Sequence, residues 1–180
     1  MFLKTIQTSR GTITVRSATP DDAQRLRALR LEALTNHPTS FGTAAEEIDK
    51  MDWTKRAAGD ANEAVFVAED DGQLVGMTGI FRNTRLKDSH YGFIWGVYVH
   101  PAHRGCGVAQ ALVNAAVEWA RDAGVAIVKL TVVPESGARA CYERCGFRVT
   151  GTDVAALKWD GRYYDEWLMS RWLTPQTEQG

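Results

Sequence analysis

The stretch that decides the fold is VYVHPAHRGCGVAQALVNAA, from Val97 to Ala116. It begins as an apolar strand, passes through a loop that contains Gly105 and Gly107, and continues with the periodicity of a helix. Because glycine has no side chain, a ligand can approach the backbone of such a loop closely. The loop amides and the positive end of the helix would point at one place and favour an anion. The sequence therefore predicts a strand–loop–helix junction that holds a ligand containing a diphosphate.

Two other interpretations of this stretch are weaker. His100, His103 and Cys106 have the regular spacing of metal ligands, but Arg104 lies among them and no fourth ligand follows closely. A dinucleotide-binding loop would need a third glycine, and a nucleotide P-loop would need a lysine after its last glycine. We therefore expect no metal at this junction, and a phosphate cradle of another shape.

The composition sets limits on the class of protein. A chain of 180 residues with 44% hydrophobic content is long enough for one domain with a substantial core. A net charge of −1, without a run of basic residues, gives no reason to expect nucleic acid or an anionic membrane as a partner. No signal peptide is recognisable, and no window approaches the roughly 18 apolar residues of a membrane span. We expect a cytoplasmic protein whose three cysteines are free thiols.

Periodicity and turn signals predict one α/β domain with a mixed sheet. Gly96 interrupts the strand before the loop, which is typical of a bulge. A helix is expected from Pro20 to about Asn36, and a weaker one over residues 44–57. The remaining elements are a first strand with Ile13 and Val15 on one face, a hairpin over 64–81, a strand over 93–99, a helix from 108, a strand over 125–133, a short helix over 138–145 and a hairpin over 153–169.

The same residues carry a resemblance to a known family. HPAHRGCGVAQALV resembles the acyl-CoA-binding motif of the GCN5-related N-acetyltransferases, R/Q-x-x-G-x-G/A, with Arg104, Gly107 and Ala109 at its fixed positions. Farther on, ARACYERCGF is similar to the family's A-x-x-x-Y-x-x-x-G-F, with Tyr142 as its tyrosine. The resemblance covers residues 11–173, which we expect to form the acetyltransferase domain, and leaves residues 174–180 as a polar tail.

The resemblance implies a fold and a co-substrate. The fold would be a mixed, mostly antiparallel seven-stranded sheet, flanked by about four helices, with its parallel fourth and fifth strands splayed around acyl-CoA. The co-substrate would be acetyl-CoA, whose pantetheine arm pairs with the fourth strand while loop amides hold its pyrophosphate. One amide near the bulge would polarise the thioester carbonyl. The residues so implied are Val97, Tyr98 and Val99 on the strand, and Arg104, Gly105, Cys106, Gly107, Val108 and Ala109 in the loop and first helical turn.

One position departs from the family pattern. Relatives usually carry an asparagine seven residues before the tyrosine, where it contacts the cofactor arm. This chain has Glu135 at that place, followed by Ser136. Either residue is a candidate for the contact, and the backbone grip on the cofactor does not depend on it.

The resemblance also implies direct transfer of the acetyl group to a primary amine. Tyr142 would donate a proton to the departing thiolate. No motif identifies the base that deprotonates the amine. His90 has the most suitable unperturbed pKa, while Glu69, Asp165, Glu166 and a water chain remain alternatives.

The acceptor is left open by the sequence. Alternation places Tyr163 and Asp165 on one face of the last strand, and with Trp95 they are candidates for an aromatic pocket that binds a cationic amine. The same aromatic residues are typical of subunit interfaces, so a homodimer is an alternative role for them. We expect a small-molecule or peptide amine as substrate. The rival interpretation is a non-catalytic acyl-CoA-binding sensor or interaction domain.

Overall fold

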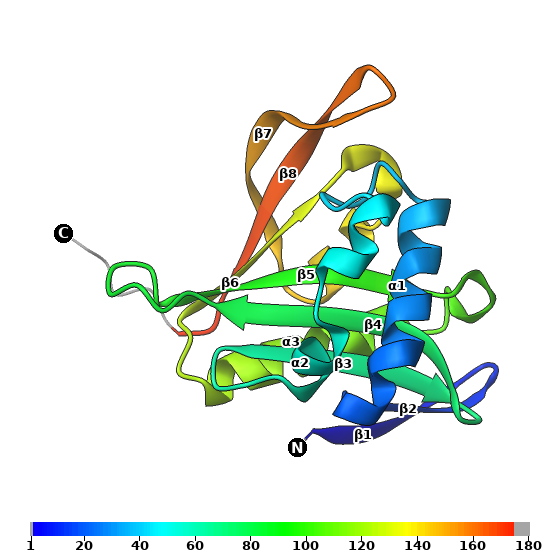
Figure 1. Cartoon of the computed structure of the whole chain (residues 1–180). Coiled ribbons are helices and arrows are strands. Elements are labelled where there is room, and N and C mark those ends of the chain that lie inside the picture. The colour runs from blue at the N-terminus through cyan, green and yellow to red at the C-terminus, as the bar shows by residue number, and fades with distance from the viewer. Residues whose placement is uncertain (1, 175–180) are drawn as a thin grey trace.

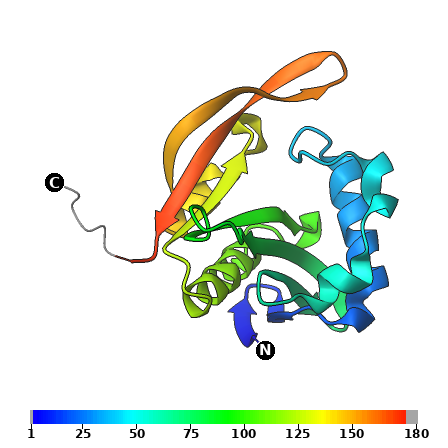
Figure 2. The same ribbon diagram turned by 60° about the vertical axis from the view of Figure 1, so that its left-hand side comes forward.

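The computed structural model describes residues 2–174, which form one mixed sheet with helices on both faces (Figures 1 and 2). The strands are β1 (Leu3–Thr8), β2 (Gly11–Ser17), β3 (Glu63–Asp70), β4 (Gln73–Arg82), β5 (Tyr91–Val99), β6 (Ile127–Val132), β7 (Arg148–Trp159) and β8 (Arg162–Trp172). The α-helices are α1 (Ala23–Asn36), α2 (Trp53–Ala58), α3 (Val108–Asp122) and α4 (Arg139–Arg144). Four 3₁₀ turns join them: η1 (Pro20–Asp22), η2 (Ala45–Lys50), η3 (Pro101–His103) and η4 (Pro134–Ser136).

The strands lie in the order β1-β2-β3-β4-β5-β6-β8-β7, and only β5 and β6 run parallel. The expectation of seven strands was one too few, because β1 pairs with β2 from Leu3 opposite Arg16 to Thr8 opposite Gly11. β1 is an edge strand whose side chains are mostly exposed, so it carries no apolar alternation that the sequence could reveal. The sheet therefore starts before residue 11, and most of the expected polar tail lies outside the described residues.

Each face of the sheet is covered by its own helical layer. Helices α3 and α4 pack on one face, while α1 and α2 cover β3, β4 and β5 on the other. Most of the apolar side of α3 is buried, as its periodicity predicts, and Trp119 is half-buried. The second predicted helix is divided in the structure into η2 and α2, and the Asp52 side chain caps α2 by accepting from the Lys55 amide at 2.9 Å.

Helix α1 starts from a buried ionic cluster. The Asp22 carboxylate is fully buried and accepts two bonds from Arg16, at 2.7 and 2.9 Å, and one from the Thr19 amide at 2.8 Å. Arg25 completes the cluster. Hydrogen bonding from Arg16 is the main cause that holds the pKa of Asp22 far below its usual range, against the opposing effect of burial. The turn is thereby fixed and α1 is anchored on β2.

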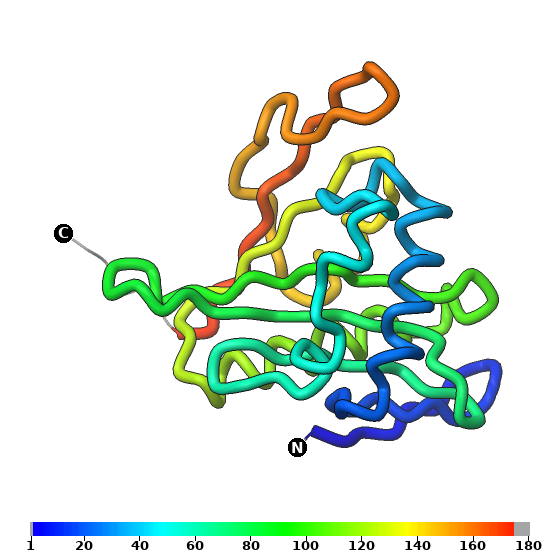
Figure 3. The backbone as a smooth tube through the Cα atoms, viewed as in Figure 1, coloured from blue at the N-terminus to red at the C-terminus, as the bar shows by residue number. Residues whose placement is uncertain are grey.

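The two parallel strands separate along their length. β5 pairs with β6 only from Tyr91 to Phe93, after which they part (Figure 3). On its other side, β5 shifts register against β4: Gly96 and Val97 have no ladder partner opposite Thr78. Gly96 has a φ of 64°, a left-handed conformation that suits glycine. The expected bulge is therefore present, and it lies where the strands part.

The Asp22 cluster gives a stability prediction. The substitution Asp22→Asn keeps the shape but leaves Arg16 and Arg25 with less compensating charge, and should lower the free energy of unfolding by about 3 kcal/mol. Because the folded-state pKa of Asp22 is depressed, its contribution exists above the usual carboxyl range and is lost as the pH falls. Urea denaturation should therefore show a difference in the free energy of unfolding between Asp22→Asn and wild type that becomes smaller as the pH is lowered. Asp21→Asn, an exposed neighbour, is the control.

Candidate functional site

A cavity of about 890 Å³ occupies the space between the parted ends of β5 and β6. It extends from the η3–α3 loop to the segment that joins α1 to α2, so elements far apart in the sequence form its walls. Leu130, Thr131 and Val132 of β6 face the residues of β5 across it. This size and enclosure are typical of a small-molecule or cofactor site.

The loop before α3 has the geometry of an anion cradle. Gly105 and Gly107 have φ values of 76° and 91°, and an added Cβ at either position would meet nothing within 4 Å. Glycine is therefore favoured there by backbone conformation and not by lack of room. Ala111 donates to the Gly107 carbonyl at 3.0 Å, so the amides before it in α3 have no carbonyl within the helix. These amides and the helix dipole favour a phosphate.

Arg104 fastens this loop to the rest of the site. Its Nε donates to the Val99 carbonyl at 2.9 Å, and its Nη2 lies 2.9 Å from His37 Nε2. Because a guanidinium can only donate, the His37 ring accepts and is neutral at this nitrogen. Burial, followed by the charge of Arg104, lowers the pKa of His37 and favours that state. Arg104 therefore links the cradle to β5 and α1.

The structure brings most of the expected cofactor residues to the cavity. Val108 is instead buried beneath the loop, while Glu135 is exposed and does not line the cavity. Tyr98 lies under α1, where its hydroxyl donates to Glu32 at 2.7 Å. Cys106 donates to the His103 carbonyl at 3.0 Å. The expected residues that line the cavity are Val97, Tyr98, Val99, Arg104, Gly105, Ala109 and Ser136.

Tyr142 reaches the cavity from α4. It is 7% exposed, and no hydrogen bond joins its hydroxyl to another of the described residues. Burial raises the pKa of Tyr142 above its usual value, so the phenol stays protonated at neutral pH. Cys141, on the same short helix, also faces the cavity. A protonated phenol in this place can act as a proton donor.

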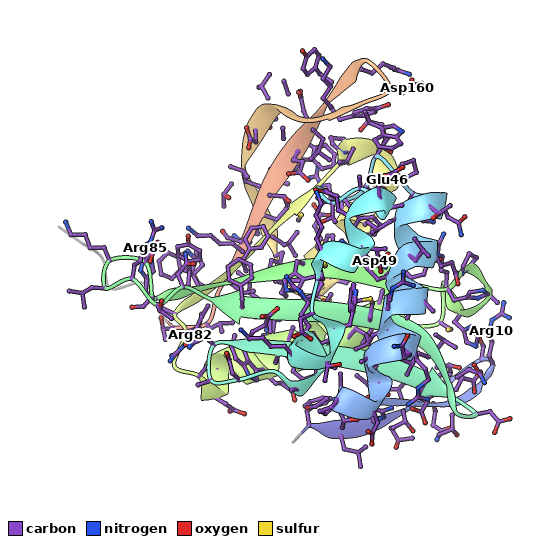
Figure 4. All side chains as sticks on the ribbon, viewed as in Figure 1. Arg10, Glu46, Asp49, Arg82, Arg85 and Asp160 are labelled. Atoms are coloured by element: carbon purple, nitrogen blue, oxygen red, sulfur yellow. The ribbon has the colours of Figure 1, made fainter. Side chains whose placement is uncertain are left out.

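The structure does not bring His90 to the cavity. His90 precedes β5 and is exposed, whereas the bulge lies near the far end of that strand. Seven residues of extended chain separate His90 from Val97, which is about 23 Å. Figure 4 labels Arg85, in the loop before β5, at the left of the view, and Arg10, in the β1–β2 turn, at the right. His90 therefore has no part in the arrangement described below.

The last strand presents a different face from the one expected. Tyr163 is 64% exposed, and Asp165 accepts from the Ala155 amide of β7 at 2.8 Å; neither lines the cavity. Glu166, the residue after Asp165, faces the cavity and is half-buried. Burial is the main cause that raises the pKa of Glu166. The alternation was therefore read correctly, but the opposite side of the strand faces the site.

The end of the cavity away from the cradle contains residues that the sequence analysis did not select. Arg30 of α1 and the Arg56–Glu63 ion pair, 2.7 Å long, line it together with Trp95. Trp95 was expected here, and the Arg56 guanidinium stacks on its ring at 4.7 Å. Gly79 makes room for the indole, since an added Cβ would lie 2.1 Å from it. No local motif marks these charges, because they meet only through the tertiary fold.

The described residues contain no group of three His, Cys, Asp or Glu side chains that could hold a metal ion. His103, one of the residues with metal-ligand spacing, lies 2.8 Å from Asp70 through its Nε2. His100 accepts from the Ala102 amide through its Nδ1. Residues 2–174 also include no helix with the length and apolar character that crossing a membrane requires.

A phosphate cradle, two parted parallel strands and a buried proton donor define a transferase that uses a long, diphosphate-containing acyl carrier. Residues 26–147 match the acetyltransferase (GNAT) family, and the chain belongs to that family. This membership, together with relatives named as N-acetyltransferases, makes the chain an N-acetyltransferase. The expected family and enzyme class are thereby confirmed.

Two relatives illustrate the range of the family. The chain is 34% identical over 147 residues to an aminoglycoside N(6')-acetyltransferase type 1 of Stenotrophomonas maltophilia, which covers 76% of this chain and 87% of the relative. It is 35% identical over 108 residues to N-acetyltransferase 8 of Rattus norvegicus, covering 57% of this chain and 47% of that longer protein.

Solved structures support the fold. YncA of Salmonella typhimurium, a putative acetyltransferase solved with its cofactor acetyl-CoA, superposes with a TM-score of 0.77 at 19% identity, over 93% of this chain and 98% of that one. A ribosomal-protein-alanine N-acetyltransferase of Brucella melitensis gives 0.75 at 25% identity, over 88% and 99%. The expected splayed sheet is thus confirmed, and acetyl-CoA agrees with both the cavity and the family.

The cradle predicts the effect of one methyl group. Gly105→Ala forces an L-residue into a left-handed conformation at a cost of about 1–2 kcal/mol, or distorts the loop. We expect the dissociation constant for CoA, measured by calorimetry, to rise about tenfold. Gly124→Ala is the matched control, since Gly124 has a φ of 72° and equally open surroundings at the other end of α3. An unchanged constant in Gly105→Ala would contradict the cradle.

Proposed function

We propose that the chain transfers the acetyl group of acetyl-CoA to a primary amine of a small molecule or peptide, by direct attack in a ternary complex. The observation that carries this proposal is the cavity between β5 and β6, which has a glycine-lined loop at one end and Tyr142 in its wall. A carrier that is long, flexible and anionic at one end matches this shape. The acceptor would enter from the end that contains Arg30, Trp95 and Glu166.

In this arrangement, acetyl-CoA completes the sheet. Its pantetheine arm would lie along Val97–Val99 and supply hydrogen bonds that β6 no longer supplies there. The pyrophosphate would take the amides of the loop and first turn of α3, so Cys106, Gly107 and Val108 would contribute through their backbone. Ser136, at the cavity wall, would contact the arm in place of the exposed Glu135.

The reaction would proceed through a tetrahedral intermediate. The amine nitrogen attacks the thioester carbonyl, whose oxygen takes up negative charge next to the Val97 amide, one donor of an oxyanion site. The carbon–sulfur bond then breaks, and the proton of the Tyr142 hydroxyl passes to the sulfur of CoA. Tyr142 regains a proton from solvent or from the amine before the next cycle.

Glu166 is the base that the geometry favours. Glu166 lines the cavity, and burial is the main cause that raises its pKa. A carboxylate with a raised pKa is a stronger base than one with an ordinary pKa. Asp165 is committed to the backbone of β7 and points away.

The comparisons support a small acceptor. One bacterial relative, which aligns over most of both chains, is named for an aminoglycoside. The mammalian relatives are roughly twice as long as the aligned segment, so they say less about the acceptor. A cytoplasmic location and a homodimer remain predictions from the sequence.

The role of Tyr142 has a direct test. Tyr142→Phe removes one oxygen that no described side chain or backbone group contacts, so folding should be preserved. We expect kcat to fall about 100-fold in a thiol-release assay, with acetyl-CoA binding unchanged. Tyr163→Phe, on the exposed face of β8, should retain full activity. Full activity of Tyr142→Phe would remove this residue from the mechanism.

The role of Glu166 predicts a pH profile. The wild-type rate should rise with pH through the raised pKa of Glu166, because only the ionised carboxylate accepts the proton. Glu166→Gln should lower kcat about 100-fold at neutral pH and abolish that acidic limb. Asp165→Asn carries the same change on the outer face, and its profile should match the wild type. An acidic limb that persists in Glu166→Gln would assign the base elsewhere.

A further inference from the structure

Arg30 is a buried cation that forms no ion pair within residues 2–174. It lies on the inner side of α1, is 4% exposed and lines the acceptor end of the cavity. Its Nε and Nη1 atoms are buried, and neither bonds to an acceptor within residues 2–174. Burial, and secondly the charge of Arg56, lower the pKa of Arg30 to about 10, so it still carries its charge at neutral pH.

The neighbours of Arg30 do not compensate for this burial. Its guanidinium carbon lies 4.4 Å from the centre of the Phe41 ring. Such a contact stabilises the cation through its flat face, whereas the N–H groups point outward in the guanidinium plane. Arg56 adds a second positive charge, and Glu63 is already paired with it at 2.7 Å. Buried charged donors without acceptors destabilise the folded state. Their presence in the wall of a cavity therefore indicates a ligand that supplies the acceptors.

A second unpaired donor lies at the same end. The indole Nε1 of Trp95 is buried and has no hydrogen-bond partner among the described residues, and Trp95 also lines the cavity. Two elements, α1 and β5, thus bring uncompensated N–H groups to one region. A ligand that fits there must provide acceptor oxygens and negative charge.

We propose that Arg30 binds a carboxylate of the acceptor, and that the acceptor is therefore an amino acid or a close analogue. This inference rests on the proposed acetyl transfer and specifies its substrate class. A planar carboxylate can accept two parallel bonds from one guanidinium, and the Trp95 indole can supply a further donor. The amine of the same molecule would face the thioester and Glu166.

The position of Arg30 also sets the length of the molecule. A Cβ built on Gly96 would lie 3.3 Å from Arg30 Nη1, so the guanidinium sits directly beneath the bulge. Val97, next in the chain, is the residue proposed to polarise the thioester carbonyl. Carboxylate and amine must therefore be separated by one or a few carbon atoms. An α-amino acid meets this requirement, whereas a peptide N-terminus, whose α-carboxylate is an amide, does not.

Wild-type protein can test the substrate class first. Thiol release from acetyl-CoA is measured with free amino acids, their methyl esters, the amines that lack the carboxyl group, dipeptides and an aminoglycoside. We expect kcat/KM for the best amino acid to exceed that of its ester and its decarboxylated amine by about 30-fold, the loss typical of a charged hydrogen bond. Equal or better use of amines without a carboxylate overturns the inference but leaves the proposed acetyl transfer intact. No acetylation of any amine overturns both.

Variants then assign the effect to Arg30. Arg30→Met keeps most of the volume and removes a charge that has no partner, so its thermal midpoint should equal or exceed the wild-type value. Its KM for the amino acid should rise about 30-fold, while its kinetics with the decarboxylated amine stay unchanged. Arg30→Lys should recover part of the affinity. Arg27→Gln, a half-buried position on the same helix whose side chain pairs with the exposed Asp49 and does not line the cavity, should change neither substrate's kinetics.

The remaining outcomes also decide the question. CoA binding, measured by calorimetry, shows whether each variant is folded. If Arg30→Met binds CoA normally and still prefers the amino acid to its ester, a residue other than Arg30 reads the carboxylate and the assignment is wrong. If the variant does not fold, the wild-type comparison of acid, ester and amine alone supports or overturns the substrate class.

Discussion

The separation of β5 from β6 is the constraint on which the rest of the site depends. Their ladder ends at Phe93, and the bulge at Gly96 and Val97 interrupts the ladder on the other side of β5. Backbone groups in the interior of a sheet need partners, and an extended ligand with amide groups can supply them as an added strand. The glycine φ of 64° makes this break compatible with an otherwise regular strand. The cofactor can therefore be understood as the missing strand of the sheet.

The two ends of the cavity achieve anion binding by opposite means. At the loop end, the positive charge is the partial charge of main-chain amides, and the guanidinium of Arg104 is bound to Val99 and His37. At the acceptor end, the charge is that of a whole side chain, Arg30, which is buried on the inner side of α1. Main-chain amides suit a large, well-hydrated diphosphate, whereas a single buried guanidinium suits a small planar anion. Each end would thus select a different part of the ternary complex.

Local signals in the sequence predicted the parts of the site that are local in the structure. The glycine loop, Tyr142 and the bulge at Gly96 each follow from a few neighbouring residues. β1 was not predicted because most side chains of this edge strand are exposed, so the strand has no apolar alternation. His90 was misplaced because a residue next to a strand can lie at either of its ends. The face of β8 could not be chosen either, since alternation groups Asp165 with Tyr163 but does not say which group meets the cavity. No local motif marks Arg30, because its burial depends on tertiary contacts such as the one with the Phe41 ring.

Helix α1 shows how a buried charge can be read for function. Among the described residues the buried charged side chains are Asp22 and Arg30, both contributed by this segment. The Asp22 carboxylate accepts bonds from Arg16, Arg25 and the Thr19 amide, so its burial is explained by the fold alone. The Nε and Nη1 atoms of Arg30 have no such hydrogen-bond partners among the described residues. Burial without compensation destabilises a protein unless a ligand supplies the missing acceptors. The contrast between two charges about two turns apart therefore separates a residue that holds the helix from one that awaits a substrate.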